Sequence, residues 1–201
     1  ILSTATGWGK QSPAVGKINS KASFEELSTN AAALRDAGKV SEAIKSYKAA
    51  LDIRPDWNEG WWYLGTLNYD ADHYGEAIVA LQKLVELDPE LGPAWAFLGL
   101  SEFETRDYKN SLAHLQNAHQ RGYGDDNELA KVAKYHLAVL FNFTGEYEKS
   151  LELFGSDATR VQVPDQIKVV LGMSLLRIPL LPNEVDPGKD ALIHTAGDAA
   201  A

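Results

Sequence analysis

Five histidines are the residues of this sequence with the most versatile chemistry at neutral pH, because an imidazole can bind a metal or transfer a proton. His114 and His119 are five residues apart, so they project from different faces of a helix. His73 follows Asp70 and Asp72 at a predicted turn, a group that a metal could use but that solvated turns also produce. We interpret it as a polar turn. The sequence therefore predicts no metal site and no cofactor.

The residue patterns of covalent and phosphate-binding catalysis are also missing. The chain has no cysteine, which excludes disulfides, thiolate nucleophiles and cysteine-ligated zinc. It contains no HExxH motif, no glycine-rich phosphate loop and no GxSxG elbow. Acidic pairs such as Glu25-Glu26 and Asp125-Asp126 are typical of solvated helix starts. We therefore predict that the protein is not an enzyme.

Charge and hydropathy narrow the choice of partner. The chain has 201 residues, of which 45% are hydrophobic and 23% charged, and its formal net charge is -9. An acidic surface repels phosphate groups, which argues against nucleic acid and against anionic membrane surfaces. No apolar run approaches the roughly 18 residues that a transmembrane helix needs. The composition favours a protein or peptide partner.

Residues 1–22 differ from the rest of the sequence. They contain Lys10, Lys17 and Lys21 and no acid, so their charge is +3 and the remainder carries -12. They are rich in Ser, Thr and Gly and show no helical period. We expect residues 1–22 to form a flexible leader.

A period of 34 residues dominates the chain after the leader. Each period contains two apolar stripes at helical spacing with a short break between them, which predicts a pair of antiparallel helices. Such a pair cannot bury both helices alone, so neighbouring pairs must stack. The residues that align at this spacing are Leu27, Trp61 and Trp95; Asn30, Leu64 and Leu98; Ala31, Gly65 and Gly99; Val40, Tyr74 and Tyr108; Ala43, Ala77 and Ser111; Tyr47, Leu81 and Leu115; Ala50, Leu84 and Ala118; and Pro55 and Pro89.

This pattern resembles the tetratricopeptide repeat (TPR) family over about residues 24–178. Its order is a large apolar residue, Leu-Gly, a tyrosine, Ala, an aromatic residue or Leu, Ala and a terminal Pro. The resemblance implies an all-α fold, a right-handed α-solenoid of antiparallel helix pairs. It covers most of the chain, and residue size, spacing and order recur together.

The repeat register predicts the helices and their grouping. The fourth unit is out of step, because Gly99 and Ala138 are 39 residues apart and the surplus lies at about 122–127. We expect an array over 23–178, with units at about 24–57, 58–91, 92–125 and 126–164 and a half unit at 165–178. The helices are expected at about 24–37, 40–53, 58–71, 74–87, 92–105, 108–121, 126–144, 147–157 and 165–177.

Residues 179–201 are predicted to cap the array. Pro179 and Pro182 prevent a regular helix directly after the half unit. We expect residues 179–186 to fold back and bury Leu180 or Leu181 against the last two units. A final helix is expected to begin after Asp186, with Pro187 at its first position, and to dock at the same end or offer a second contact surface.

The TPR resemblance implies that the first helix of each unit lines a concave groove. Trp62 and Tyr69 are interpreted as groove residues, whereas Leu100, Phe103 and Val139 are either groove residues or simply buried. Trp61 and Trp95 are expected to be buried between helices. The positions at which some TPR proteins hold a carboxylate carry Ser28, Ala32, Tyr63, Pro93 and Ala96, so that mechanism is not implied here. The predicted partner-binding residues are Trp62, Thr66, Tyr69, Leu100, Phe103, Tyr135, Asn142 and Arg35.

These observations lead to one functional hypothesis and two alternatives. The leading hypothesis is a non-catalytic scaffold that binds a peptide or helix in an apolar, aromatic-rich groove. The alternatives are a structural module for oligomerisation or envelope assembly and the regulatory TPR part of a larger enzyme. The sequence leaves the partner, the compartment and the oligomeric state open.

Overall fold

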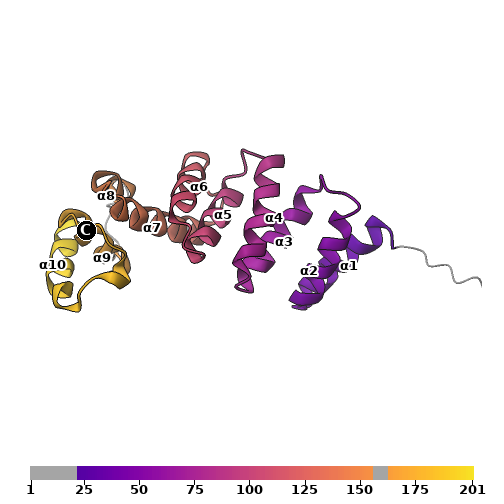
Figure 1. Cartoon of the computed structure of the whole chain (residues 1–201), viewed down its shortest axis with the longest axis horizontal. Helices are drawn as coiled ribbons and strands as arrows, with labels where there is room; N and C mark the ends of the chain where they lie inside the picture. Colours follow the sequence, from indigo (N-terminus) through magenta and orange to yellow (C-terminus); the bar gives the residue numbers. More distant parts are fainter. Residues whose placement is uncertain (1–21, 156–162) are drawn as a thin grey trace, which may run out of the picture.

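The computed structural model describes residues 22–155 and 163–201, which form ten α-helices and two short 3-10 turns without any β-strand. The helices follow one another along an elongated array (Figure 1). The predicted leader lies outside the described residues apart from residue 22. The helices are α1 (Phe24–Asp36), α2 (Val40–Leu51), α3 (Asn58–Asp70), α4 (Tyr74–Leu87), α5 (Gly92–Glu104), α6 (Tyr108–Arg121), α7 (Asn127–Phe143), α8 (Tyr147–Gly155), α9 (Asp165–Leu175) and α10 (Asp190–Ala200), and the 3-10 turns are η1 (Pro182–Glu184) and η2 (Pro187–Lys189).

Polar side chains fix the starts of several helices. The hydroxyl of Ser23 accepts a hydrogen bond from the backbone N–H of Glu26, whose carboxylate accepts one from the N–H of Ser23 in return. This reciprocal pair satisfies two donors that the first helical turn leaves open. Asp107 and Asp126 cap α6 and α7 in a similar way, each accepting from a backbone N–H three residues further on.

The turn inside each helix pair repeats the same backbone conformation. One residue with a positive φ angle stands there in all five cases, at Gly38 (70°), Asp72 (58°), Arg106 (64°), Gly145 (81°) and Arg177 (53°). Its N–H donates to a carbonyl three residues earlier, as Arg106 does to Phe103, which closes the end of the first helix. Only glycine adopts this conformation without steric cost, so three of the five turns carry a small local penalty.

The observed helices agree with the repeat register. For α1 to α7, each limit lies within two residues of its predicted position. The final helix differs, because residues 187–189 form the turn η2 and α10 begins at Asp190. The Asp186 carboxylate accepts the N–H of Gly188 at 2.9 Å and holds this turn in place of a first helical turn.

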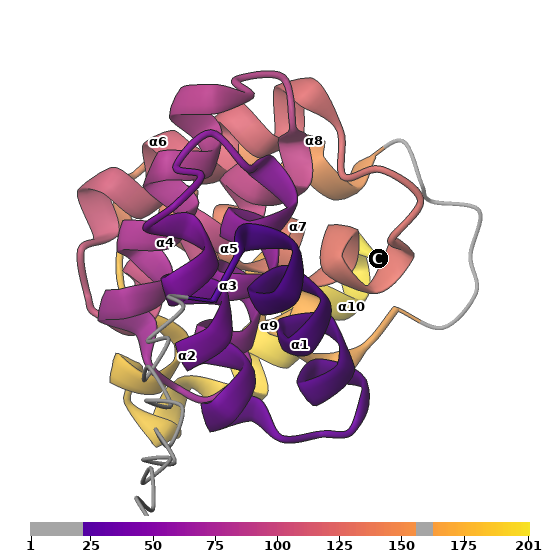
Figure 2. The same cartoon turned by 90° about the vertical axis from the view of Figure 1, so that its right-hand side faces the viewer.

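The array is held together by close packing between consecutive helices. A Cβ on Gly65 would lie 2.7 Å from Leu81, and one on Gly99 would lie 2.7 Å from Leu115. Glycine therefore stands mid-helix because the partner helix leaves no room for a larger side chain. Figure 2 shows that α2, α4, α6 and α8 follow an outer arc, whereas α3, α5, α7 and α9 lie nearer its centre. The chain is an all-α helical repeat solenoid. None of the described helices is long and apolar enough to cross a membrane.

The segment after α9 covers the end of the array. Leu181 is buried in a cluster with Ala138, Val139 and Val170, whereas Leu180 is 37% exposed. The prediction that one of these two leucines packs against the last two units is confirmed. Helix α10 lies directly on α9, where a Cβ on Gly172 would be 2.0 Å from the carbonyl oxygen of Ile193.

Candidate functional site

The inner helices α3 and α5 bring three aromatic rings into contact. The ring centroids of Trp62 and Phe97 are 5.6 Å apart, and those of Phe97 and Tyr69 are 5.2 Å apart, both pairs with nearly perpendicular planes. Tyr69 also contacts Tyr74 at the start of α4. Trp62, Phe97 and Tyr69 are each half-buried, so one side of this group remains in contact with solvent.

A second group of rings continues on α5 and α7. Phe103 packs edge-on against His136 at a centroid distance of 4.6 Å, and His136 contacts Tyr135 at 5.2 Å. All three side chains are half-buried. We call the two groups together, Trp62, Tyr69, Phe97, Phe103, Tyr135 and His136, the aromatic wall. Trp, Tyr and Phe in such a setting offer large contact areas at low cost in side-chain entropy.

Carboxylates surround the middle of the aromatic wall. Burial raises the pKa of Tyr69, and the negative charges of Glu104, Asp70 and Asp72 add to the effect. A hydrogen bond from its hydroxyl to Asp72, 2.6 Å long, raises the pKa of Tyr74 to about 12. The wall therefore combines apolar ring surface with negative potential.

His136 is neutral under most conditions. Burial lowers its pKa, while its hydrogen bond to the carbonyl of Val132 and the charge of Glu104 act in the opposite direction. The Nδ1 atom lies 2.8 Å from that carbonyl oxygen, so it carries the proton in the neutral ring. His136 thus contributes to the wall as an uncharged aromatic side chain.

Thr66 and Arg35, also predicted to bind a partner, lie at the margin of the aromatic wall. The hydroxyl of Thr66 donates to the carbonyl of Trp62 at 3.0 Å, a bond within α3. The guanidinium of Arg35 stacks over the ring of Tyr63 at 3.8 Å and donates to the hydroxyl of Tyr47. Its charge is paired with Asp36 at 2.9 Å. Arg35 is therefore already held by side chains of its own chain.

Two predicted groove residues do not lie on an accessible surface. Leu100 is 2% exposed and belongs to the core cluster between α5, α6 and α7. Asn142 is 1% exposed, and its amide donates to the carbonyl of Val170 while accepting from the hydroxyl of Ser174. The tight contact between inner helices covers both side chains, so we remove them from the candidate site.

The expectation for Trp61 and Trp95 also needs correction. Both rings pack against core clusters, but each is only half-buried. Their indole N–H groups donate to the carbonyls of Pro55 and Pro89, each at 2.8 Å. The ring thus extends from the core to the loop before its own helix, which keeps its polar edge near solvent.

Sequence reasoning missed Phe97 and His136, although both belong to the aromatic wall. Phe97 follows Tyr63 at the spacing of 34 residues, and that alignment was the available signal. His136 has no such signal, because it lies after the five extra residues of the fourth unit. Its place beside Phe103 depends on how α7 packs on α5.

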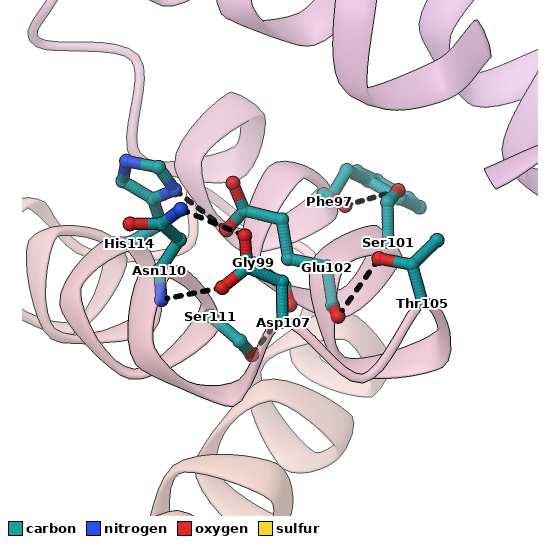
Figure 3. Close-up of polar contacts among 9 residues, drawn as sticks. All are labelled: Phe97, Gly99, Ser101, Glu102, Thr105, Asp107, Asn110, Ser111 and His114. Atoms are coloured by element: carbon teal, nitrogen blue, oxygen red, sulfur yellow. Dashed lines mark hydrogen bonds and ion pairs between the residues drawn. The ribbon is translucent and has the colours of Figure 1, made fainter. Parts of the chain in front are cut away.

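A buried polar pair on the outer side of α5 was also unexpected. The carboxylate of Glu102 is 2.6 Å from Nδ1 of His114 on α6, and Glu102 is 2% exposed (Figure 3). Ser111 nearby donates to the carbonyl of Gly99 at 2.7 Å. These contacts join the two helices of one pair. Within the described residues, no group of three His, Asp or Glu side chains could hold a metal ion.

Comparison with known proteins agrees with this geometry. The TPR repeat family matches the sequence over residues 31–72, which span parts of the first two helix pairs. The chain is a TPR protein. The helix pairs on either side of these residues, with equivalent turns and equivalent tryptophan contacts, extend the TPR architecture along the array. No curated protein matches the sequence of the chain.

Solved structures show the same TPR fold at low sequence identity. A crystal structure of the MamA protein is 20% identical and has a TM-score of 0.66, covering 88% of this chain and 91% of that one. YrrB, described as a TPR protein with an unusual peptide-binding site, is 17% identical with a TM-score of 0.66, covering 90% and 93%. Residues 41-end of MamA from Desulfovibrio magneticus RS-1 are 21% identical with a TM-score of 0.56, covering 66% and 72%. At these identities the likeness concerns the fold.

Proposed function

We propose that this TPR protein is a non-catalytic scaffold that binds a peptide or helical segment of a protein partner along the aromatic wall. The observation that carries the proposal is the run of half-buried rings on the inner helices, from Trp62 to Tyr135. Rings that are held by their neighbours yet still exposed offer contact area without much loss of side-chain entropy on binding. The description of YrrB as a peptide-binding TPR protein supports the same role.

Selection from a random peptide library on the whole protein tests the proposal. Peptides that bind the wild-type protein are measured again on the variants Phe103→Ala and Tyr135→Ala. We expect both variants to weaken binding at least about tenfold, because truncation of a central aromatic contact typically costs about 2 kcal/mol. Circular dichroism and the melting temperature establish that each variant is folded.

A control on the outer arc separates the wall from general apolar attraction. Val79 on α4 is 60% exposed, so Val79→Ala removes exposed apolar surface away from the inner helices. Binding of the selected peptides should be unchanged in this variant. Peptides that bind Phe103→Ala and Tyr135→Ala as tightly as the wild type would contradict the proposed function.

A further inference from the structure

A pocket opens beside the aromatic wall at the place where the repeat is out of step. It lies between the N-terminal ends of α3, α5 and α7 and has a cavity volume of about 420 Å³. Trp62 belongs both to this pocket and to the wall, so a segment that follows the wall passes the pocket mouth. The apolar residues that line it are Trp62, Leu84, Leu91, Pro93, Tyr123 and Leu129.

The extra residues of the fourth unit build one side of this pocket. Gly122 and Gly124 adopt positive φ angles of 83° and 66°, which turn the chain back over the start of α5. The carbonyl oxygen of Gly122 comes so near that a Cβ on Gly92 would lie 1.8 Å away. Tyr123 between them is buried in the core, and burial raises its pKa to about 12. The loop is therefore anchored on both sides, and the pocket has a fixed wall.

Carboxylates alone supply the charge around the pocket within the described part of the chain. The charged residues that line it are Glu59, Asp125 and Asp126, with no lysine or arginine among them. Asp126 caps α7 by accepting the N–H of Leu129, whereas Glu59 and Asp125 are exposed. Arg121, next to the loop, donates to the carbonyl of Pro89 and does not line the pocket.

The helix ends that face the pocket reduce its negative potential without reversing it. Each helix N-terminus acts as roughly half a positive charge, so three of them offset about half of the three carboxylates. The remaining charge is negative and adjoins a tryptophan ring, a combination that favours a cation over an anion or a neutral group. An apolar floor with an acidic rim also matches an aliphatic stem that ends in a charge.

We infer that this pocket receives a lysine or arginine side chain of the partner segment, an inference that rests on the proposed function. The methylene groups pack on Trp62 and Leu91, and the cationic head lies at the rim between Glu59 and Asp125. The carboxylates of Asp70, Asp72 and Glu104 near Tyr69 extend the same preference along the wall. The partner is accordingly a basic segment with apolar or aromatic residues, opposite in charge to the net charge of -9 of this chain.

The test uses peptides that depend on the wall. From the random library, we retain peptides that bind the wild-type protein but not the Phe103→Ala variant, and we count their lysine and arginine residues. We expect these residues to be enriched. The double variant Glu59→Gln/Asp125→Asn should bind the retained peptides roughly threefold to tenfold more weakly, as expected for two partly solvated ion pairs. Acetylating the critical lysine should weaken binding to the wild type and abolish the difference between the two proteins.

A matched charge change elsewhere is the control. Asp52 and Glu76 line a separate cleft between α2 and α4, so Asp52→Asn/Glu76→Gln removes the same two charges away from the pocket. Its binding should equal that of the wild type. The inference is overturned if the retained peptides lack basic residues, or if Glu59→Gln/Asp125→Asn binds them unchanged. If no peptide depends on Phe103, the proposed function itself fails, and the inference with it.

Discussion

Replacing Gly172 by alanine sets helix propensity against helix packing. In an exposed helix this change raises stability by about 1 kcal/mol. Gly172 instead faces the backbone of α10, where an added Cβ would lie 2.0 Å from the carbonyl oxygen of Ile193 and 3.0 Å from the nitrogen of Gly197. Ordinary contacts need about 3.5 Å. Because both neighbours are backbone atoms, no side-chain rotation can relieve the clash, and the two helices must move apart by more than about 1 Å.

The expected loss follows from what that separation disturbs. Forcing an extra methyl group into a packed interface costs about 1–3 kcal/mol. Ile193 is 2% exposed, and its full burial contributes about 1.5–3 kcal/mol, so undocking of α10 sets an upper limit on the loss. After the gain in helix propensity is subtracted, we expect Gly172→Ala to lower the free energy of unfolding by about 2 kcal/mol or to release α10 locally.

Two measurements distinguish these outcomes. Urea unfolding reports the global loss, and hydrogen exchange of amides 190–200, together with tryptic cleavage after Lys189, reports release of α10. Gly75→Ala in α4 is the control, because no atom lies within 4 Å of its added Cβ, and its stability should be equal or slightly higher. If Gly172→Ala matches Gly75→Ala in stability and its α10 amides stay protected, the packing argument is refuted.

Three further outcomes are expected. Arg106→Gly should gain about 0.5–1 kcal/mol in urea unfolding, because relief of the left-handed strain exceeds the entropy cost of glycine; a loss of stability would contradict the turn analysis. His114→Leu should lose about 3 kcal/mol by leaving the carboxyl of Glu102 buried without its partner, and Glu102→Leu in that background should restore much of it. Stability should fall as the pH drops below about 6.5, because burial lowers the pKa of His136 and the unfolded chain binds the proton first. His136→Phe should show a shallower decline in a pH series of thermal melts, with the contribution of His119 remaining.

The helices could be predicted because the repeat fixes both their length and their spacing. Gly38, Pro55 and Pro89 mark breaks that occur at equivalent places, so errors at one boundary are corrected by the next. The candidate site was less predictable, since a repeat specifies which residues face the inner side but not how closely adjacent inner helices approach. Leu100 and Asn142 are covered for that reason.

Contacts between separate helices had no signal in the sequence. Glu102 and His114 are 12 residues apart on antiparallel helices, a spacing with no meaning until the turn between α5 and α6 is known. Phe97 and His136 enter the aromatic wall through the relative rotation of neighbouring pairs. These positions depend on side-chain packing, which the 34-residue pattern constrains only in outline.

The core of this protein is divided into four clusters that follow one another along the array. Such an arrangement gives the molecule the mechanics of a spring, because each junction between helix pairs can twist by a small angle without breaking the others. A partner that contacts α3, α5 and α7 together would fix the pitch of that spring over the length it spans. Tension applied to the two ends of the array would then be resisted most strongly where the partner lies, and extension would begin at the junctions left uncovered.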